Sequence, residues 1–98
     1  MTKLFEVRDK TGRNVYLPSI TWSHIVRKHP YVSSYFEEIK ETVQKPDKIT
    51  DYSLDKDVRY HYKYYKHRES PNQYLLVIVK YLNSSGFIIS AYFVKGIK

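Results

Sequence analysis

The spacing of hydrophobic residues changes about halfway along the chain, from a helical period to the two-residue period of strands. In the first half, an apolar stripe at positions i, i+3, i+4 and i+7 is formed by Trp22, Ile25, Val26 and His29. This spacing predicts one face of a short helix, which Pro30 ends because proline cannot continue the hydrogen-bond ladder. A second apolar stripe, formed by Phe36, Ile39 and Val43, predicts a further helix.

Polar residues and prolines predict where these two helices begin and end. Ser19 or Thr21 is expected to cap the first helix, because hydroxyl side chains accept hydrogen bonds from free backbone N–H groups. The second helix is predicted to begin at Ser34, with Glu37 three residues later completing a capping box. It is predicted to end before Pro46.

Strands are predicted on both sides of the helices. Segments 4–8 and 15–17 flank a turn-rich stretch and predict an N-terminal β-hairpin. Four more strands, joined by short connections that favour an antiparallel meander, are predicted at 49–53, 58–66, 74–82 and 87–94. We therefore expect a single α+β domain over residues 1–98, in which an N-terminal hairpin and two helices pack on a four-stranded antiparallel sheet.

The strand at 58–66 alternates between two sets of side chains. The tyrosines at positions 60, 62 and 64 form one set, which is expected to pack against the helices. The other set is expected to face solvent, where its cations could bind phosphates and its ring could stack on a base; it consists of Arg59, His61, Lys63 and Tyr65. A solvated sheet face with no ligand would show the same alternation.

The composition and net charge indicate which class of partner the protein could bind. Seventeen Lys and Arg residues against ten Asp and Glu give a net charge of +7 and a pI near 9.5, which favours a polyanion such as RNA. The chain has no cysteine, so thiolate catalysis and cysteine-based zinc sites are excluded. Its longest apolar run, 74–79, is far shorter than the roughly 20 residues of a membrane span. We expect a cytoplasmic protein that does not associate with membranes.

Candidate chemistry begins on the first predicted helix. His24 shares a helix face with Arg27 and Lys28, at i+3 and i+4, and this basic edge could bind RNA. An exposed histidine on an ordinary solvated face is the alternative interpretation. His29 lies on the apolar stripe beside Pro30, which favours a buried histidine at the helix end over a catalytic one.

A further group of polar side chains falls on the last two predicted strands. Lys80 ends an apolar run, and Ser90 and Tyr92 share one side of the final strand. They either form hydrogen bonds within the core or line an active surface, because burial without partners would be costly. The acidic residues form no cluster that would hold Mg²⁺, and the histidines lack a zinc spacing. Phosphodiester cleavage here would therefore need no metal or other cofactor, and would favour RNA, whose 2′-hydroxyl can attack the adjacent phosphorus.

Several of these segments, in this order, resemble a known family. The run Trp22–Ile25 followed by His29 is similar to the helix motif of phage-type ribonucleases of the BECR superfamily, a group that takes its name from barnase, EndoU, the tRNA-cleaving colicins and RelE. Segment 37–49 resembles the second helix of that family and its exit, and segments 77–80 and 86–92 resemble its final hairpin. The resemblance extends from about residue 15 onward.

The resemblance implies a metal-independent RNA endonuclease, often a toxin that a cognate antitoxin or immunity protein inhibits. It also implies that helices cover one side of the sheet while RNA is cut on the other. Matched by motif, His24 would be the helix histidine, Arg59 the phosphate-binding cation and Lys80 a charge stabiliser. Ser90 would supply the hydroxyl group of the last strand, beside Tyr92, at a position where such proteins commonly have Thr. His29 also belongs to the motif.

Two functions from other classes fit the same residues. A non-catalytic RNA-binding module would use the same cations for phosphates and would leave RNA intact. A protein-interaction module would dock its basic face on an acidic partner and would bind no RNA at physiological salt.

Overall fold

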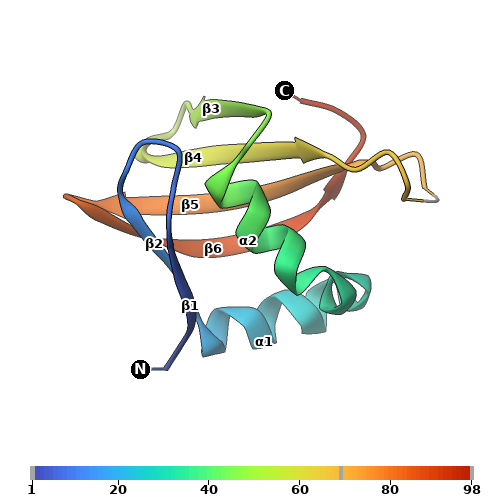
Figure 1. The fold of residues 1–98 in the computed structure, drawn as a ribbon, viewed down its shortest axis with the longest axis horizontal. Helices are drawn as coiled ribbons and strands as arrows, with labels where there is room; N and C mark the ends of the chain where they lie inside the picture. Colours follow the sequence, from blue (N-terminus) through green and yellow to red (C-terminus); the bar gives the residue numbers. More distant parts are fainter. Residues whose placement is uncertain (1, 69, 98) are drawn as a thin grey trace.

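Six strands and three helical segments make up the part of the chain described by the computed structural model, residues 2–68 and 70–97. In chain order the elements are β1 (Lys3–Arg8), β2 (Asn14–Pro18), α1 (Ser19–Lys28), the 3₁₀ helix η1 (Pro30–Tyr35), α2 (Phe36–Gln44), β3 (Lys48–Tyr52), β4 (Asp55–Tyr64), β5 (Tyr74–Leu82) and β6 (Ser85–Val94). The strands form one sheet in the order β1-β2-β6-β5-β4-β3 (Figure 1). The α+β class expected from the sequence is confirmed.

The sheet is larger than the sequence indicates, because the N-terminal hairpin belongs to it. Strands β3 to β6 form the antiparallel meander that the short connections predict. Strand β2 then pairs in parallel with β6 through residues 14–16, so the hairpin extends the sheet to six strands of mixed direction. Val15 and Leu17 of β2 are fully buried, which explains why the hairpin lies against the core and not outside it.

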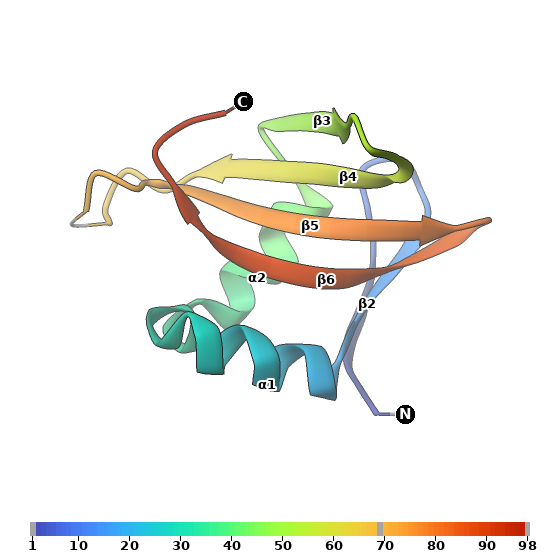
Figure 2. The same ribbon diagram turned by 180° about the vertical axis from the view of Figure 1, so that it is seen from behind.

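All helical segments cover the same face of the sheet. Figure 1 shows α2 across that face, and Figure 2 shows the opposite face, which no helix covers, with α1 running alongside β6. The main core lies between the helices and the sheet and includes Ile25 of α1, Ile39 and Val43 of α2, and Val77 and Val79 of β5. We call the uncovered side the open face.

The two faces of β4 are the reverse of the sequence expectation. Register pairs Arg59 with Val79 and His61 with Val77, and both valines are fully buried beneath the helices. The basic side chains of β4 therefore project from the face of the sheet that the helices cover. The tyrosines at positions 60, 62 and 64 lie on the open face, where Tyr60 and Tyr62 join a second, smaller apolar cluster. The neighbouring strand β5 is apolar on both faces, so its sequence does not show which face lies under the helices. The alternation on β4 alone therefore could not show which of its two sets of side chains faces the helices.

The helix ends also differ in detail. Pro18 and Tyr35 precede α1 and α2, and neither helix has a side-chain capping hydrogen bond, so the predicted Ser19, Thr21 and Ser34 caps are wrong. The second helix begins at Phe36, because η1 occupies residues 30–35. The stop at Pro30 is confirmed. None of the helices within residues 2–68 and 70–97 has the length and apolar character that crossing a membrane requires.

Candidate active site

A cleft of about 310 Å³ lies where α1 meets β6. Its walls are formed by His24, Ile25, Lys28, His29, Ile89 and Ser90. Helical periodicity explains the contribution of α1, because positions 24, 25, 28 and 29 fall on neighbouring rows of one helix side. Ile25 is 3% exposed and anchors that side to the sheet, while His24 and Lys28 remain exposed at the rim. The cleft thus has an apolar floor and basic, proton-exchanging groups at its edge.

His29 reaches the sheet because α1 ends there. Its backbone N–H donates to the carbonyl of Ile25 at 2.7 Å, and the backbone then leaves the helical conformation before Pro30. The imidazole stacks on the ring of Tyr92, with centroids 5.0 Å apart and planes inclined by 24°. His29 is half-buried and lines the cleft. The stack on Tyr92 restricts the orientation of its ring. His29 lies at the helix end as expected, but it is only partly buried.

A β-bulge places Ser90 and Tyr92 on the open face. Ile88 pairs with Val79 and Ser90 pairs with Ile78, so Ile89 is an extra residue with no partner on β5. Strict alternation would have put Ser90 on the same buried side as Ile88; the extra residue reverses the faces beyond it. Ser90 and Tyr92 are consequently half-exposed beside α1. The alternative that both form hydrogen bonds within the core is removed.

The two cations expected in the catalytic set do not line this cleft. Arg59 lies 3.6 Å from the carboxylate of Asp51, and its side chain starts from the helix side of β4. Lys80 donates to Asp55 at 2.9 Å, a contact that raises the pKa of Lys80 and lowers that of Asp55. Both cations are paired with carboxylates, and neither lines the cleft. Lys28 supplies the cation at the cleft in their place.

The expected RNA-binding strip on β4 is not a free surface either. His61 is fully buried, and Lys63 donates to the backbone carbonyl of Lys45 at 2.9 Å. Tyr65 follows β4 and packs against the core, and its hydroxyl donates to Glu41 at 2.6 Å. Lys63 and Tyr65 therefore hold the sheet to α2 and the residue that follows it, whereas His61 bonds to Tyr81 of β5. Of the RNA-binding set, Arg27 and Lys28 are exposed on α1 as expected.

A buried chain of polar groups escaped the sequence analysis. The hydroxyl of Tyr81 donates to the carboxylate of Asp9 and lies 3.0 Å from Nε2 of His61. Burial, opposed by the charge of Asp9, lowers the pKa of His61 to about 4, so the imidazole is neutral. Burial alone would raise the pKa of Asp9, but hydrogen bonds from Tyr81, Thr11 and the backbone of Arg13 lower it overall. Tyr81 lies 72 residues from Asp9, so no local pattern marks the pair.

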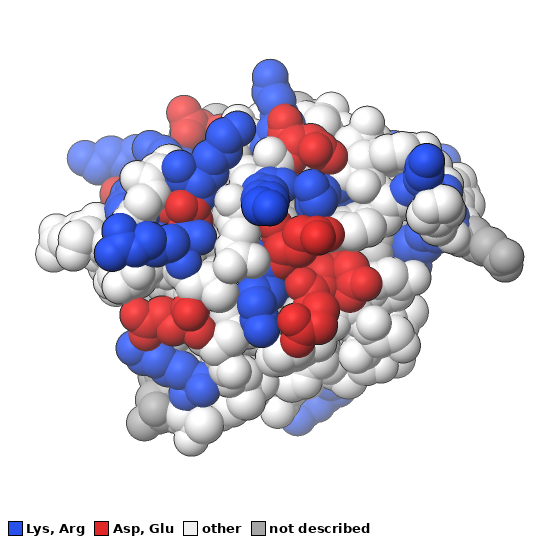
Figure 3. Space-filling view, viewed as in Figure 1, with Lys and Arg blue, Asp and Glu red and all other residues white. Residues whose placement is uncertain are grey.

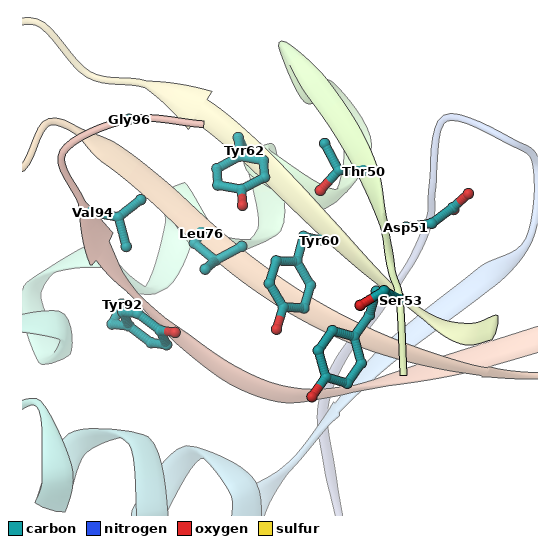
Figure 4. Close-up of a pocket in the computed structure, with 10 residues that line it drawn as sticks. Thr50, Asp51, Ser53, Tyr60, Tyr62, Leu76, Tyr92, Val94 and Gly96 are labelled. Atoms are coloured by element: carbon teal, nitrogen blue, oxygen red, sulfur yellow. The ribbon is translucent and has the colours of Figure 1, made fainter. Parts of the chain in front are cut away.

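A wider groove of about 470 Å³ adjoins Tyr92 on the open face (Figure 4). Tyrosine side chains at positions 52, 60, 62 and 92 and the apolar side chains of Leu76 and Val94 line much of it, and we call it the tyrosine groove. The sequence shows the alternating tyrosines of β4, but they were predicted to pack against the helices, so the groove on the open face was not predicted.

The arrangement can support proton transfer next to an anion. Two imidazoles, an ammonium group and a serine hydroxyl border one cleft, and these groups can donate protons and stabilise negative charge. Among residues 2–68 and 70–97, no three His, Asp or Glu side chains gather closely enough to hold a metal ion. Comparisons with protein-family models, with curated protein sequences and with solved structures each give no match.

Proposed function

We propose that the chain is a metal-independent RNA endonuclease, similar to the BECR ribonucleases, that cuts RNA at the α1–β6 cleft. The observation that supports this proposal most strongly is the convergence of His24, Lys28 and His29 with Ser90 on one small cleft. Histidine is the commonest acid–base group in enzymes near neutral pH. His24 of α1 and His29, the residue that follows α1, lie beside a cation. This set of groups suits a reaction with two proton transfers and a charged transition state.

The proposed reaction uses the 2′-hydroxyl of RNA as its nucleophile. One imidazole removes the 2′-hydroxyl proton while the 2′-oxygen forms a bond to the adjacent phosphorus. The bond from phosphorus to the 5′-oxygen breaks, and that oxygen takes a proton from the second acid–base group. The products are a 2′,3′-cyclic phosphate and a free 5′-hydroxyl, so no water, metal or cofactor enters this step.

His24 and His29 are the candidates for the two proton-transfer groups. His24 is exposed at the rim, whereas the His29 ring is fixed by its stack on Tyr92. Lys28 is placed to stabilise the charge that develops on the phosphate oxygens, and Ser90 can donate a hydrogen bond to one of them. Preorganised donors of this kind typically contribute about 10²- to 10³-fold each in rate.

The fold supports the finer assignment to a BECR-like architecture in one respect. Figure 2 shows one face of the sheet that no helix covers. Ser90, which lines the cleft, projects from that face, in keeping with what the resemblance implies. The six-stranded mixed sheet is a departure from the four strands expected. We include a cognate antitoxin or immunity protein in the proposal, because a cell that makes a ribonuclease without restraint would damage its own RNA.

The charge distribution is compatible with a polyanionic substrate. On the helix side, acidic side chains gather over α2, which contains Glu37, Glu38 and Glu41 (Figure 3). Lysine and arginine side chains gather over the β1–β2 hairpin on the same side (Figure 3). The last turn of α1, at the margin of the cleft, contains Arg27 and Lys28. These cations can attract a phosphate backbone over several ångströms.

The reaction class is tested with the wild-type protein alone. We expect it to cut single-stranded RNA in excess EDTA and to leave 2′,3′-cyclic phosphate ends, and we expect no cutting of the same sequence when every ribose is 2′-deoxy. RNA that stays intact while it binds in a salt-dependent manner would replace the proposal with a binding module. Cutting of the 2′-deoxy strand would remove the proposed nucleophile.

A further inference from the structure

The tyrosine groove is open, mainly apolar and formed from four neighbouring strands, β3 to β6. Tyr60 and Tyr62 come from β4, Leu76 from β5 and Tyr92 from β6, and all project from the open face (Figure 4). Its rings are already arranged for flat contacts, since Tyr52 and Tyr60 stack with centroids 5.6 Å apart and planes inclined by 12°. A groove of about 470 Å³ with these walls can take a flat, aromatic group.

A single ring stack connects the wall of the groove to the wall of the cleft. Tyr92 lines the groove and stacks on His29, which lines the cleft. Ser90 lies in the cleft two residues earlier on the same face of β6, which is about 7 Å along the strand. A ligand bound in the cleft could therefore extend along β6 into the groove.

The two hollows differ in chemistry in the way that the two ends of a nucleotide differ. The cleft has the ammonium of Lys28 and two imidazoles, which suit a phosphate. The groove is lined mainly by phenol rings and aliphatic side chains, with hydroxyl groups at Thr50, at Ser53 and on the tyrosines. Asp51, whose carboxylate pairs with Arg59, also lines it. Burial, reinforced by the neighbouring tyrosines, raises the pKa of the Tyr60 phenol, so this hydroxyl stays protonated and can donate to a base edge.

We propose that the tyrosine groove holds the base of a single-stranded nucleotide whose phosphate lies in the α1–β6 cleft. The inference rests on the proposed function, because it assigns the groove to the substrate of that same cleft. Stacking on tyrosine is favourable for every base, since each has a π-face. Hydroxyl groups both donate and accept, so we expect little preference among the four bases. A base paired within a duplex cannot enter, so the substrate class is single-stranded RNA.

The test measures binding without cleavage. The probe is a fluorescent tetranucleotide with 2′-O-methyl riboses, which has no free 2′-hydroxyl, and its partner is the abasic tetranucleotide with the same backbone. Stacking is worth roughly 1–3 kcal/mol per base. We therefore expect the wild-type protein to bind the base-bearing probe at least about tenfold more tightly than the abasic one.

Two variants assign that preference to the groove. Tyr60→Leu retains an apolar side chain and should reduce affinity for the base-bearing probe toward that for the abasic one. Tyr64→Leu is the matched control, because Tyr64 is an exposed tyrosine of the same strand that does not line the groove. It should leave both affinities unchanged. Equal effects of the two substitutions would overturn the assignment.

The outcomes separate this inference from the nuclease proposal. Equal binding of both probes by a wild-type protein that cuts RNA overturns the base groove and leaves the nuclease. The same equality would also be found if the groove instead docks a protein. A strong preference for the base-bearing probe in a protein that leaves RNA intact supports the groove and removes the nuclease.

Discussion

The imidazole of His29 lies flat against the ring of Tyr92, with centroids 5.0 Å apart and planes inclined by 24°. This contact joins the end of α1 to the open face of β6 and lies between the cleft and the tyrosine groove. An imidazole held in this way loses little further freedom when a substrate binds, which is the condition for an oriented acid–base group. In the proposed mechanism, this stack would position the imidazole as well as pack against it.

The first prediction concerns this stack. Tyr92→Phe keeps the ring and removes only the hydroxyl, so RNA cleavage by this variant should stay within about threefold of the wild type. Tyr92→Leu removes the aromatic surface and frees the imidazole, and its rate should fall about tenfold or more. The measurement is kcat on a short RNA, with thermal unfolding to show that both variants are folded. Equal rates for the two variants would show that the stack does not position His29.

The second prediction distinguishes the cation found at the cleft from the one expected there. Lys28→Ala should lower kcat/KM by about 10²-fold, because the charge on the transition state loses its nearest cation. Lys28→Arg should recover part of that loss. Arg59→Ala should retain cleavage, since Arg59 pairs with Asp51 on β4 and does not line the cleft.

Initial rates on one RNA substrate compare these three variants. If Arg59→Ala lowered kcat/KM as much as Lys28→Ala, Arg59 would belong to the active site, which would contradict its position outside the cleft.

The positions of most strands and both helices could be predicted, because they depend on local periodicity. The strand β5 was predicted with its observed bounds, since its apolar run ends sharply at both sides. The site could be predicted only in part. His24, His29 and Ser90 line one cleft and Tyr92 stacks on His29, whereas Arg59 and Lys80, which were predicted to share the site, do not line the cleft because their positions depend on strand register. Register is set by pairing across the sheet, which a single sequence does not show.

The bulge at Ile89 shows this limit most directly. One extra residue turns Ser90 from the buried face to the open one, and nothing in the local sequence marks it. The reversed faces of β4 have the same origin, since Val77 and Val79 on the neighbouring strand determine which side of β4 faces the helices. The chain Asp9–Tyr81–His61 unites three separate strands or turns and could be recognised only in three dimensions.

The third prediction is a loss of stability on mild acidification. His61 has a folded-state pKa of about 4, below its ordinary value of 6.5, because it is buried. Between these values the unfolded chain binds a proton that the folded protein does not, so the free energy of unfolding falls as the pH falls. From pH 7 to pH 5, His61 should account for a loss of about 2 kcal/mol.

Urea unfolding at several pH values tests this sign. His61→Gln keeps a donor for the Tyr81 hydroxyl but does not titrate, so its stability should change less between pH 7 and pH 5. Parallel pH profiles for the wild type and this variant would show that His61 is not the group responsible.

The fourth prediction concerns the hydroxyl at the centre of the buried chain. Tyr81→Phe removes the donor to Asp9 and leaves Nε2 of His61 without its partner. Leaving buried polar groups unpaired costs about 1–3 kcal/mol each, so the urea concentration at the midpoint of unfolding should be lower for this variant than for the wild type. Tyr64→Phe is the control, because that hydroxyl is exposed, and it should change stability by less than about 0.5 kcal/mol. A Tyr81→Phe variant as stable as the control would argue against the chain.

The cleft as a site of RNA cleavage is tested most directly by removing the exposed imidazole at its rim. Initial rates on one single-stranded RNA in EDTA should be compared for the wild type, His24→Ala and His67→Ala, where His67 is an exposed histidine of the β4–β5 connection outside the cleft. We predict that His24→Ala loses about 10²- to 10⁴-fold in kcat while His67→Ala cuts at the wild-type rate. Cleavage by folded His24→Ala at the wild-type rate would contradict the assignment of the active site to this cleft.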